Sequence, residues 1–442
     1  MNTDSRALAR RDFWLVLLLV VVVGRLFWLD LRATSAGVDF YQFWLVGQAQ
    51  QRVTIEDIYA PEGRRVLLEA GRSVLSAQPD SARLGGAVEF RQSIETFSTP
   101  LLYMAVDSLA RGDYDVDLAR FHLLSFVCFV LGVGLLSRLC RMSWTTTGLI
   151  LLVLFACSEP LRSDARVGNV NQIQLAGIAL YLWLLRGSSS ALRQGLAGAF
   201  VGVLTLFKPT LGLGFGFLAL GWLLRREWRR LAIECVGFSI AAVAVIAASS
   251  AFLGSRRAWL DWLAALPALS RDADVSVAIG NFSLARVVTE QGGPDVSAPL
   301  LLVLVLATAC ALWLGARRAP RERSEARAFE RELLTFVLGC ASCVVALPLV
   351  WLHYEILLVP LAVFLLRSRG ASSAPGLVER IALALASVCV LGRPIAAFAP
   401  SAEPYTAALP YIAGALALVA LGLLDLFRLG RREPGSLSPS SY

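Results

Sequence analysis

The sequence predicts an all-α polytopic membrane protein, and three observations lead to that fold class. First, 57% of the residues are hydrophobic and only 17% are charged, a composition outside the range of ordinary soluble domains. Second, apolar runs of about 20 residues, the length of a membrane-spanning helix, recur along the chain. Third, clusters of arginine separate these runs. Because backbone polar groups in lipid must be paired within the segment, each run is expected to be a helix.

About twelve apolar runs predict transmembrane helices. They cover residues 13–31, 118–140, 145–158, 169–185, 192–207, 210–224, 231–253, 298–316, 332–350, 353–367, 379–399 and 408–427. The first run follows Arg6, Arg10 and Arg11 and has no small-residue cleavage site, which indicates a retained signal anchor. The alternative is ten spans, with two adjacent segments merged or re-entrant. We expect residues 1–430 to form a single transmembrane domain.

The distribution of arginine predicts the orientation of the chain. With the N-terminus in the cytoplasm, every short arginine-rich connection falls on the cytoplasmic side, in agreement with the positive-inside rule. Both termini are then cytoplasmic, and residues 431–442 are expected to form a disordered tail. The net charge of +8 follows from this pattern, so no nucleic-acid partner is expected. We expect a monomer in the cytoplasmic membrane of a bacterium, surrounded by lipid.

Two connections on the outer side are long, at about residues 32–117 and 254–297. The first contains the aromatic and amphipathic stretches FYQFWLVGQAQQR and RRVLLEAGRSVL, which predict helices lying in the membrane interface. The second contains Trp259 and Trp262 and ends in GNFSLARVV. Long ordered loops are uncommon unless they serve a function. The outer face is therefore where we expect a functional site.

Asp39 is the candidate catalytic residue. It lies in GVDFYQFW, just after the first span and next to several aromatic residues. Partial removal of a carboxylate from water strengthens its attraction for a hydroxyl proton, so Asp39 is a candidate general base. The alternative is a helix N-cap, since aspartate is an ordinary start signal. Both roles can coexist.

Lys208 and His353 are the candidate partners of an anionic group. Lys208, the only lysine, lies in TLFKPTLG between two predicted spans. A lone cation there suits a lipid phosphate, and the alternative is a lysine that reaches the interface along its stem. His353, followed by Tyr354, lies in WLHYEILLVP at the mouth of a span. It is a candidate donor to a phosphate or a hydrogen-bonded interface histidine.

A polar segment, SEPLRSDARVGNVNQIQLAG, enters one predicted helix. So many polar groups predict a water-filled or ligand-filled cavity. Arg166, Asn171 and Gln172 of this segment are candidate substrate-binding residues, as is Arg286 of GNFSLARVV, whose alternative is a solvated loop cation. Two strings of alternating aspartates, at residues 113–117 and 272–274, are explained by helix capping and solvation. We therefore expect no metal site and no cofactor.

In their order and sidedness these motifs resemble glycosyltransferase family 87. The resemblance spans residues 13–366 and rests on the outer Asp-Phe, on GNVNQIQLAGIALYLWLLRG followed by QGLAGAFVGVLTLFKPT, on GNFSLARVV and on WLHYEILLVP. It implies a GT-C-like fold and a metal-independent, inverting transfer of a hexose, often mannose, from a polyprenyl phosphate to a lipid or glycan acceptor. The family's aspartate, lysine and histidine match Asp39, Lys208 and His353. Where this sequence reads GNVNQ, the family frequently has Gly-Gln-Asn.

Two other functions are consistent with the sequence. A transporter or flippase of lipid-linked sugars is one, and Arg25 inside the first span is the residue that fits it best. A transporter should carry its polar groups near the bilayer midplane, however, whereas the candidates here gather at one face. Another GT-C transferase, acting on protein or lipid A, is the second alternative.

Overall fold

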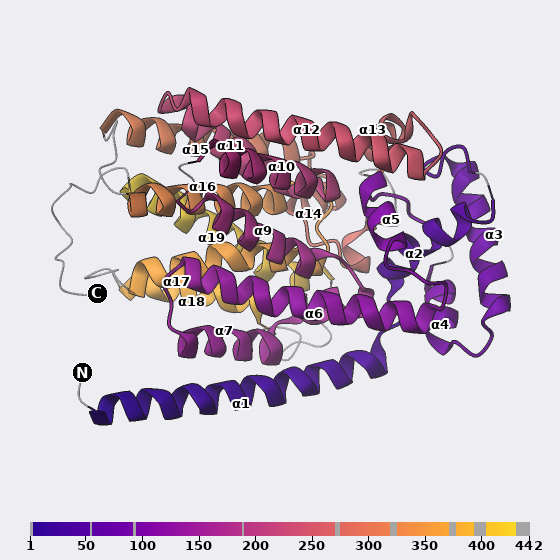
Figure 1. The fold of residues 1–442 in the computed structure, drawn as a ribbon, viewed down its shortest axis with the longest axis horizontal. Coiled ribbons are helices and arrows are strands. Elements are labelled where there is room, and N and C mark those ends of the chain that lie inside the picture. The colour runs from indigo at the N-terminus through magenta and orange to yellow at the C-terminus, as the bar shows by residue number, and fades with distance from the viewer. Residues whose placement is uncertain are drawn as a thin grey trace.

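The computed structural model describes residues 3–53, 55–91, 94–187, 190–269, 275–318, 325–370, 377–392 and 404–429, and in this part of the chain the regular elements are helices. The elements, in order, are α1 (Thr3–Thr34), α2 (Val38–Gln50), α3 (Pro61–Ala77), α4 (Ala82–Phe90), α5 (Pro100–Asp107), α6 (Tyr114–Leu139), α7 (Trp144–Cys157), α8 (Glu159–Val167), α9 (Asn171–Leu185), α10 (Ala191–Phe207), η1 (Pro209–Leu211), α11 (Gly212–Leu224), α12 (Trp228–Phe252), α13 (Ala258–Leu269), η3 (Val277–Ile279), α14 (Leu284–Glu290), α15 (Ser297–Arg318), α16 (Glu325–Ala346), η4 (Leu352–Leu358), α17 (Val359–Gly370), α18 (Leu377–Leu391) and α19 (Pro404–Leu429). The long helices form a bundle, and α2 to α5 gather at the end where α1 finishes (Figure 1). The predicted tail at residues 431–442 lies outside the described residues.

The predicted spans correspond to helices, but fewer of them are long enough to cross a membrane. Among the described residues, five helices pass by length and composition: Asp12–Thr34 of α1, Tyr114–Leu139, Trp228–Phe252, Ser297–Arg317 and Pro404–Leu429. Helices α7 and α8 are bent by 67° at a short break and count as a sixth if they form one broken span or a re-entrant loop. The protein is therefore multi-pass, and the predicted number of about twelve spans is too high.

The difference has a physical reason in the shorter segments. Helices α9, α11 and α17 contain 15, 13 and 12 residues, short of the 20 or so that span the hydrocarbon core. Helix α16 has 22 residues, but its first turns carry both acidic and basic side chains. The predicted span 353–367 begins as the short 3₁₀ helix η4 before α17. A run of apolar residues identifies a helix more reliably than it identifies a crossing.

The first predicted outer loop folds into helices that have a core of their own. Helix α2 is buried along its length, from Asp39 to Ala49, and its polar side chains Gln42 and Gln48 are buried with the apolar ones. Helix α3 is amphipathic and places Gly71 against Tyr41 and Leu45 of α2. Protein therefore covers α2 and the apolar stripe of α3, and the prediction that these stretches lie in the membrane interface stays a prediction.

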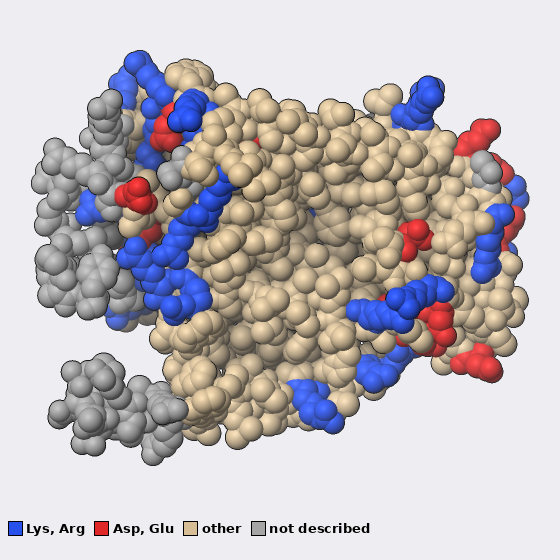
Figure 2. Space-filling model, in the orientation of Figure 1, with Lys and Arg blue, Asp and Glu red and all other residues tan. Residues whose placement is uncertain are grey.

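The second predicted outer loop contributes to the same core. Trp259 and Trp262 of α13 are buried in it, and the Trp262 indole N–H donates to the carbonyl of Phe97 at 3.0 Å. Charged side chains lie mostly toward the two ends of the face shown in Figure 2, with a broad uncharged region between them. Such a belt is what a membrane-embedded bundle presents to lipid. Helix α13 of the second loop thus joins α2 to α5 in one helical unit at one end of the bundle, whereas η3 and α14 of the same loop pack against α19 and α16.

Candidate active site

Two glycines in the left-handed backbone region bring the start of α2 against the end of α8. Gly37 (φ 67°) precedes α2, and Gly168 (φ 70°) ends α8. The Gly37 N–H donates to the carbonyl of Arg166 at 3.2 Å, and a Cβ at Gly168 would lie 2.7 Å from a side-chain atom of α2. Only glycine adopts this conformation at little cost and leaves that space free. Asp39 and Asn169, which follow the two turns, therefore lie side by side.

Asp39 lies in the first turn of α2 and is held at both carboxylate oxygens. Gly37 occupies the N-cap position, so the N-cap interpretation of Asp39 is wrong. The Arg91 guanidinium donates to Oδ1 at 2.7 Å, and the Asn169 amide donates to Oδ2 at 2.8 Å. The Nε2 atom of His353 lies 3.7 Å from Oδ2. Each carboxylate oxygen has a second lone pair, so Asp39 can still accept a proton from a ligand.

Asp164 organises the polar segment around it. It is fully buried, and it accepts hydrogen bonds from the amide groups of Asn171 at 2.8 Å and Gln172 at 3.0 Å. The same Asn171 amide donates to the backbone carbonyl of His353 at 3.0 Å. With its N–H groups used in this way, Asn171 turns its carbonyl oxygen toward Lys208. A buried carboxylate thus fixes which atom each neighbouring amide presents.

Lys208 lies where α10 ends, because Pro209 cannot continue the helix. Its ammonium donates to Oδ1 of Asn171 at 2.5 Å and to Oδ1 of Asn169 at 3.3 Å, and Nζ lies 4.0 Å from the centroid of the Tyr354 ring. Burial lowers the pKa of Lys208, and the negative charges of Asp164 and Asp39 oppose that shift. The acceptors in direct contact are neutral, so the ammonium is suited to an anionic ligand.

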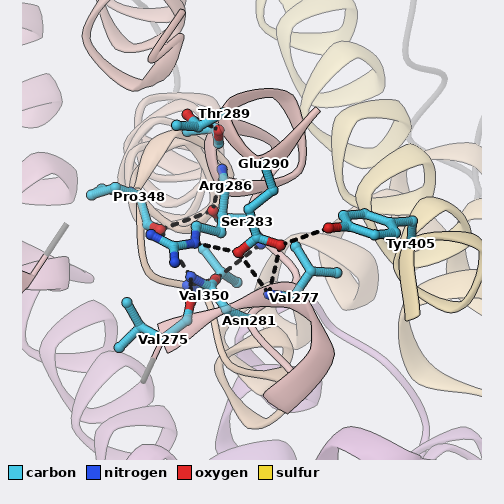
Figure 3. A network of polar contacts seen from close by, with 11 residues as sticks. Val275, Val277, Asn281, Ser283, Arg286, Thr289, Glu290, Pro348, Val350 and Tyr405 are labelled. Atoms are coloured by element: carbon cyan, nitrogen blue, oxygen red, sulfur yellow. Dashed lines mark hydrogen bonds and ion pairs between the residues drawn. The ribbon is translucent and has the colours of Figure 1, made fainter. Parts of the chain in front are cut away.

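His353 is positioned by a clamp on the segment that precedes it (Figure 3). Asn281, which is fully buried, accepts from the backbone N–H of Val350 at 2.9 Å and donates to the carbonyl of Pro348 at 3.1 Å. The Ser283 hydroxyl donates to the same carbonyl at 2.9 Å. The loop string GNFSLARVV therefore supports the backbone that leads into His353.

The imidazole of His353 is buried, and burial lowers its pKa to about 3. It is therefore neutral at physiological pH and acts through hydrogen bonding. Among the described residues its Nε2 atom has no hydrogen-bond partner. A ligand between Asp39 and Lys208 would be within its reach. The hydrogen-bonded polar residues described in the preceding paragraphs form one group, which we call the Asp39 cluster. Its members are Asp39, Arg91, Asp164, Asn169, Asn171, Gln172, Lys208 and His353.

The sequence model of glycosyltransferase family 87 matches residues 99–348, more than half of the chain. The chain belongs to glycosyltransferase family 87. It is a GT-C-type membrane glycosyltransferase, which decides between the transferase and the transporter that the sequence left open. No curated protein and no solved structure matches it. The matched range of the family includes Lys208 and Asn171, whereas Asp39 and His353 lie outside it.

Two arginines expected at the site of this family 87 enzyme have other neighbours. The Arg166 side chain is 42% exposed and pairs with Glu159 at 3.7 Å, while its carbonyl supports the turn before α2. Arg286 donates to Glu290 at 2.5 Å, and Glu290 also accepts from the Tyr405 hydroxyl at 3.0 Å. Arg286 thus belongs to the network of Figure 3, which supports the His353 segment. The structure brings together Asp39, Lys208, His353, Asn171, Gln172 and Tyr354.

The sequence of this family 87 enzyme did not indicate Arg91 as a site residue, and it did not distinguish Asp164 from the other polar residues of its segment. Arg91 and Glu95 are spaced as an ordinary i,i+4 ion pair, and nothing local indicates that Asp39 is the second partner of Arg91. Asp164 was one of many polar residues in its segment. Its full burial, which the sequence does not reveal, distinguishes it from its neighbours.

The aspartate string before α6 has structural roles. Asp113 caps the helix by accepting from the backbone N–H of Val116 at 3.0 Å. Asp117 accepts from the indole of Trp44 at 3.1 Å. Capping, one of the two explanations offered for this string, is confirmed for Asp113. Asp272 and Asp274 lie outside the described residues.

Proposed function

We propose that this enzyme transfers a hexose from a polyprenyl-phosphate donor to a hydroxyl group of a lipid or glycan acceptor, and that the hexose is mannose. Asp39 acts as the general base, and the configuration at the anomeric carbon is inverted. One observation carries the proposal: Asn169 joins the carboxylate to the ammonium, since its amide N–H donates to Asp39 at 2.8 Å and its oxygen accepts from Lys208 at 3.3 Å. A proton acceptor and a phosphate-binding cation therefore share one site.

The chemistry follows from these two groups. The acceptor hydroxyl loses its proton to Asp39 while its oxygen forms a bond to the anomeric carbon. The bond between that carbon and the phosphate oxygen breaks, and the electron pair leaves with the polyprenyl phosphate. Lys208 stabilises the charge that develops on the phosphate, and the neutral His353 imidazole can add a hydrogen bond. In this scheme side chains supply all the charge compensation, and the donor is a substrate rather than a cofactor.

The same proposal places the reaction at the outer face of the cytoplasmic membrane, with both termini inside. Helix α1 crosses once and delivers Asp39 to the end of the bundle opposite its own start (Figure 1). The arginine-rich connections support a cytoplasmic N-terminus. A lipid-linked donor could then reach the cluster from the outer leaflet.

Replacement of Asp39 by asparagine tests the proposal. Loss of the general base should lower transfer by about 10²- to 10⁴-fold, while the protein still inserts in the membrane and binds the donor. The measurement uses purified protein, labelled polyprenyl-phosphate hexoses and total lipid extract, and the labelled product identifies the sugar and acceptor. Asp115→Asn, which removes the same charge from a side chain that is 42% exposed, is the control. Full transfer by Asp39→Asn would exclude Asp39 as the base.

The product of that assay also separates the remaining alternative. A transferase that modifies lipid A would label a lipid A fraction rather than a lipid-linked glycan, and a transferase that modifies protein would label a protein only when total membrane protein replaces the lipid extract. The arrangement of Asp39 and Lys208 serves either acceptor class, since only the acceptor hydroxyl meets the base.

A further inference from the structure

Arg91 reaches Asp39 from the end of α4, and the segment that follows it is fixed to α2. The backbone N–H of Glu95 donates to the side-chain oxygen of Gln42 at 2.9 Å. Asp39 and Gln42 are three residues apart, so they lie on the same face of α2. The segment therefore contacts one face of that helix at two points, through the Arg91 side chain and through the Glu95 backbone.

The other end of this segment lies beside Lys208. The Thr99 hydroxyl, at the start of α5, donates to the carbonyl of Phe207 at 3.1 Å. Phe207 immediately precedes Lys208. The two cations of the Asp39 cluster, Arg91 and Lys208, thus belong to segments that are tied to each other.

Arg91 differs from Lys208 in what it is bonded to. Its guanidinium donates to Asp39 at 2.7 Å and to Glu95 at 2.9 Å, and the three side chains are 12–15% exposed. Its Nε atom is buried and has no hydrogen-bond partner in the described part of the chain. A guanidinium presents its N–H groups as a fork that fits a phosphate with two parallel hydrogen bonds. The Nε–H group of Arg91 is therefore a donor that neither carboxylate uses.

The hydrogen bond from Arg91 also occupies one carboxylate oxygen of Asp39, the proposed base. Oδ1 of Asp39 accepts from Arg91, and Oδ2 accepts from Asn169. Releasing Oδ1 would give the acceptor hydroxyl an unobstructed oxygen. A donor phosphate competes with Asp39 for the same guanidinium, because both are anions that accept from its N–H groups.

We propose that Arg91 is a ligand of the donor phosphate and that, in binding it, Arg91 releases Asp39. This inference rests on the proposed function. In the enzyme without donor, Arg91 is bonded to Asp39; in the loaded enzyme, it is bonded to the phosphate, and Oδ1 of Asp39 meets the acceptor. The donor therefore binds first, and the acceptor binds productively only afterwards.

Binding of undecaprenyl phosphate to the full-length protein in lipid nanodiscs tests this exchange. Arg91→Gln should weaken binding by about tenfold or more, the usual effect of losing a hydrogen bond to a charged group. Asp39→Asn should tighten binding, because Arg91 no longer has Asp39 as a competing anion. In the double variant that gain should disappear. Arg65→Gln removes the same charge from a surface residue of the same helical unit, 61% exposed, and should bind like the wild type.

Two results would overturn the exchange. One is unchanged undecaprenyl phosphate binding by Arg91→Gln, which would make Arg91 only a positioning residue for Asp39. The other is an equal gain in undecaprenyl phosphate affinity when Asp39→Asn is made in the wild type and in Arg91→Gln. The gain would then come from removing the negative charge of Asp39 and not from freeing Arg91. Arg91→Lys, which keeps the charge and loses the fork, should give intermediate binding and provides the test if Arg91→Gln fails to accumulate.

The outcomes separate this inference from the proposed function. If Asp39→Asn abolishes transfer while Arg91→Gln binds undecaprenyl phosphate like the wild type, the base assignment stands and the exchange is wrong. If Asp39→Asn transfers normally, the base assignment fails whatever the binding measurements show. Steady-state kinetics give a second readout, since loss of the exchange should convert ordered binding of donor and acceptor into random binding.

Discussion

Two buried polar clusters lie in different parts of the bundle, and they differ in how completely their hydrogen bonds are made. The Arg230 cluster, near the start of α12, is the first. Arg230 donates to both oxygens of Glu332, at 2.6 and 3.0 Å, and its guanidinium lies 4.8 Å from the centroid of the Trp222 ring. The Trp222 indole donates to Glu332 at 3.2 Å, and the Tyr181 hydroxyl donates to Glu234 at 3.3 Å.

The Asp39 cluster, at the end that holds α2 to α5, is the second. It has comparable burial, yet Nε2 of His353 and Nε of Arg91 have no partners within the described residues. Buried polar groups in proteins are nearly always hydrogen-bonded, so exceptions need an explanation. The Arg230 cluster completes its bonds internally and holds helices together, whereas the Asp39 cluster keeps capacity for a ligand. The comparison predicts that mutations in the first change stability and mutations in the second change transfer.

Breaking the Arg230 cluster should have the largest effect on stability. Arg230→Met leaves the buried Glu332 carboxylate without its cation, which typically costs about 3–5 kcal/mol. Thermal unfolding in detergent measures the loss, and Arg229→Met, at an exposed neighbour, is the matched control. Transfer per folded molecule should be unchanged. A variant as stable as the wild type would show that the cluster does not hold the helices together.

Removing the ammonium of Lys208 should have the largest effect on transfer in the Asp39 cluster after loss of the base. Lys208→Gln removes the cation that would face the donor phosphate, and we expect transfer to fall by about 10²- to 10³-fold, as for other groups that stabilise developing charge. Lys208→Arg keeps the charge and should retain part of the activity. Unfolding should shift little for both variants. Wild-type transfer by Lys208→Gln would show that the phosphate lies elsewhere.

The sequence predicted the helices and the main polar residues because both depend on local pattern. Apolar runs identify helices through the need to pair backbone groups in lipid, and every predicted segment overlaps a helix, although some extend beyond it, as residues 347–350 do beyond the end of α16. The motifs around Asp39, Lys208 and His353 were likewise recognisable, and the structure brings these three residues into one cluster. What is local in the chain was therefore predictable.

Contacts between distant segments were not predictable. Arg91 joins Asp39 across 52 positions, and the glycine turns that align α2 with α8 are recognisable only once the two turns meet. Arg286 was a candidate substrate-binding residue, and the structure places it in the network that supports the His353 backbone. The sequence shows that a residue is polar and near the outer side, whereas its partner depends on the packing of helices far apart in the chain.

The clamp on the His353 segment allows a more moderate test of the comparison. Asn281→Ala removes the bonds to Val350 and Pro348, and we expect transfer to fall by about tenfold because a small displacement of a catalytic-site group has a large effect on rate. Ser283→Ala removes one bond to Pro348 and should have a smaller effect. In a His353→Ala background, Asn281→Ala should cause little further loss. Equal losses with and without His353 would mean that the clamp acts on overall stability alone.

The smallest effect on transfer is expected at Arg166. This residue belongs to the polar segment SEPLRSDARVGNVNQIQLAG, but its side chain is not part of the Asp39 cluster. Its guanidinium pairs at 3.7 Å with Glu159, and the side chain is 42% exposed, so the ion pair contributes little. Its structural contribution is the backbone carbonyl that accepts from Ser35 at 2.8 Å, and a substitution of the side chain leaves that carbonyl in place. Arg166→Gln should therefore change transfer by less than about twofold, within the small range typical of surface substitutions. Measured beside Arg91→Gln, it compares an arginine that pairs with Asp39 with one of equal charge that pairs with Glu159. A tenfold loss of transfer in Arg166→Gln would show that Arg166 does bind the donor.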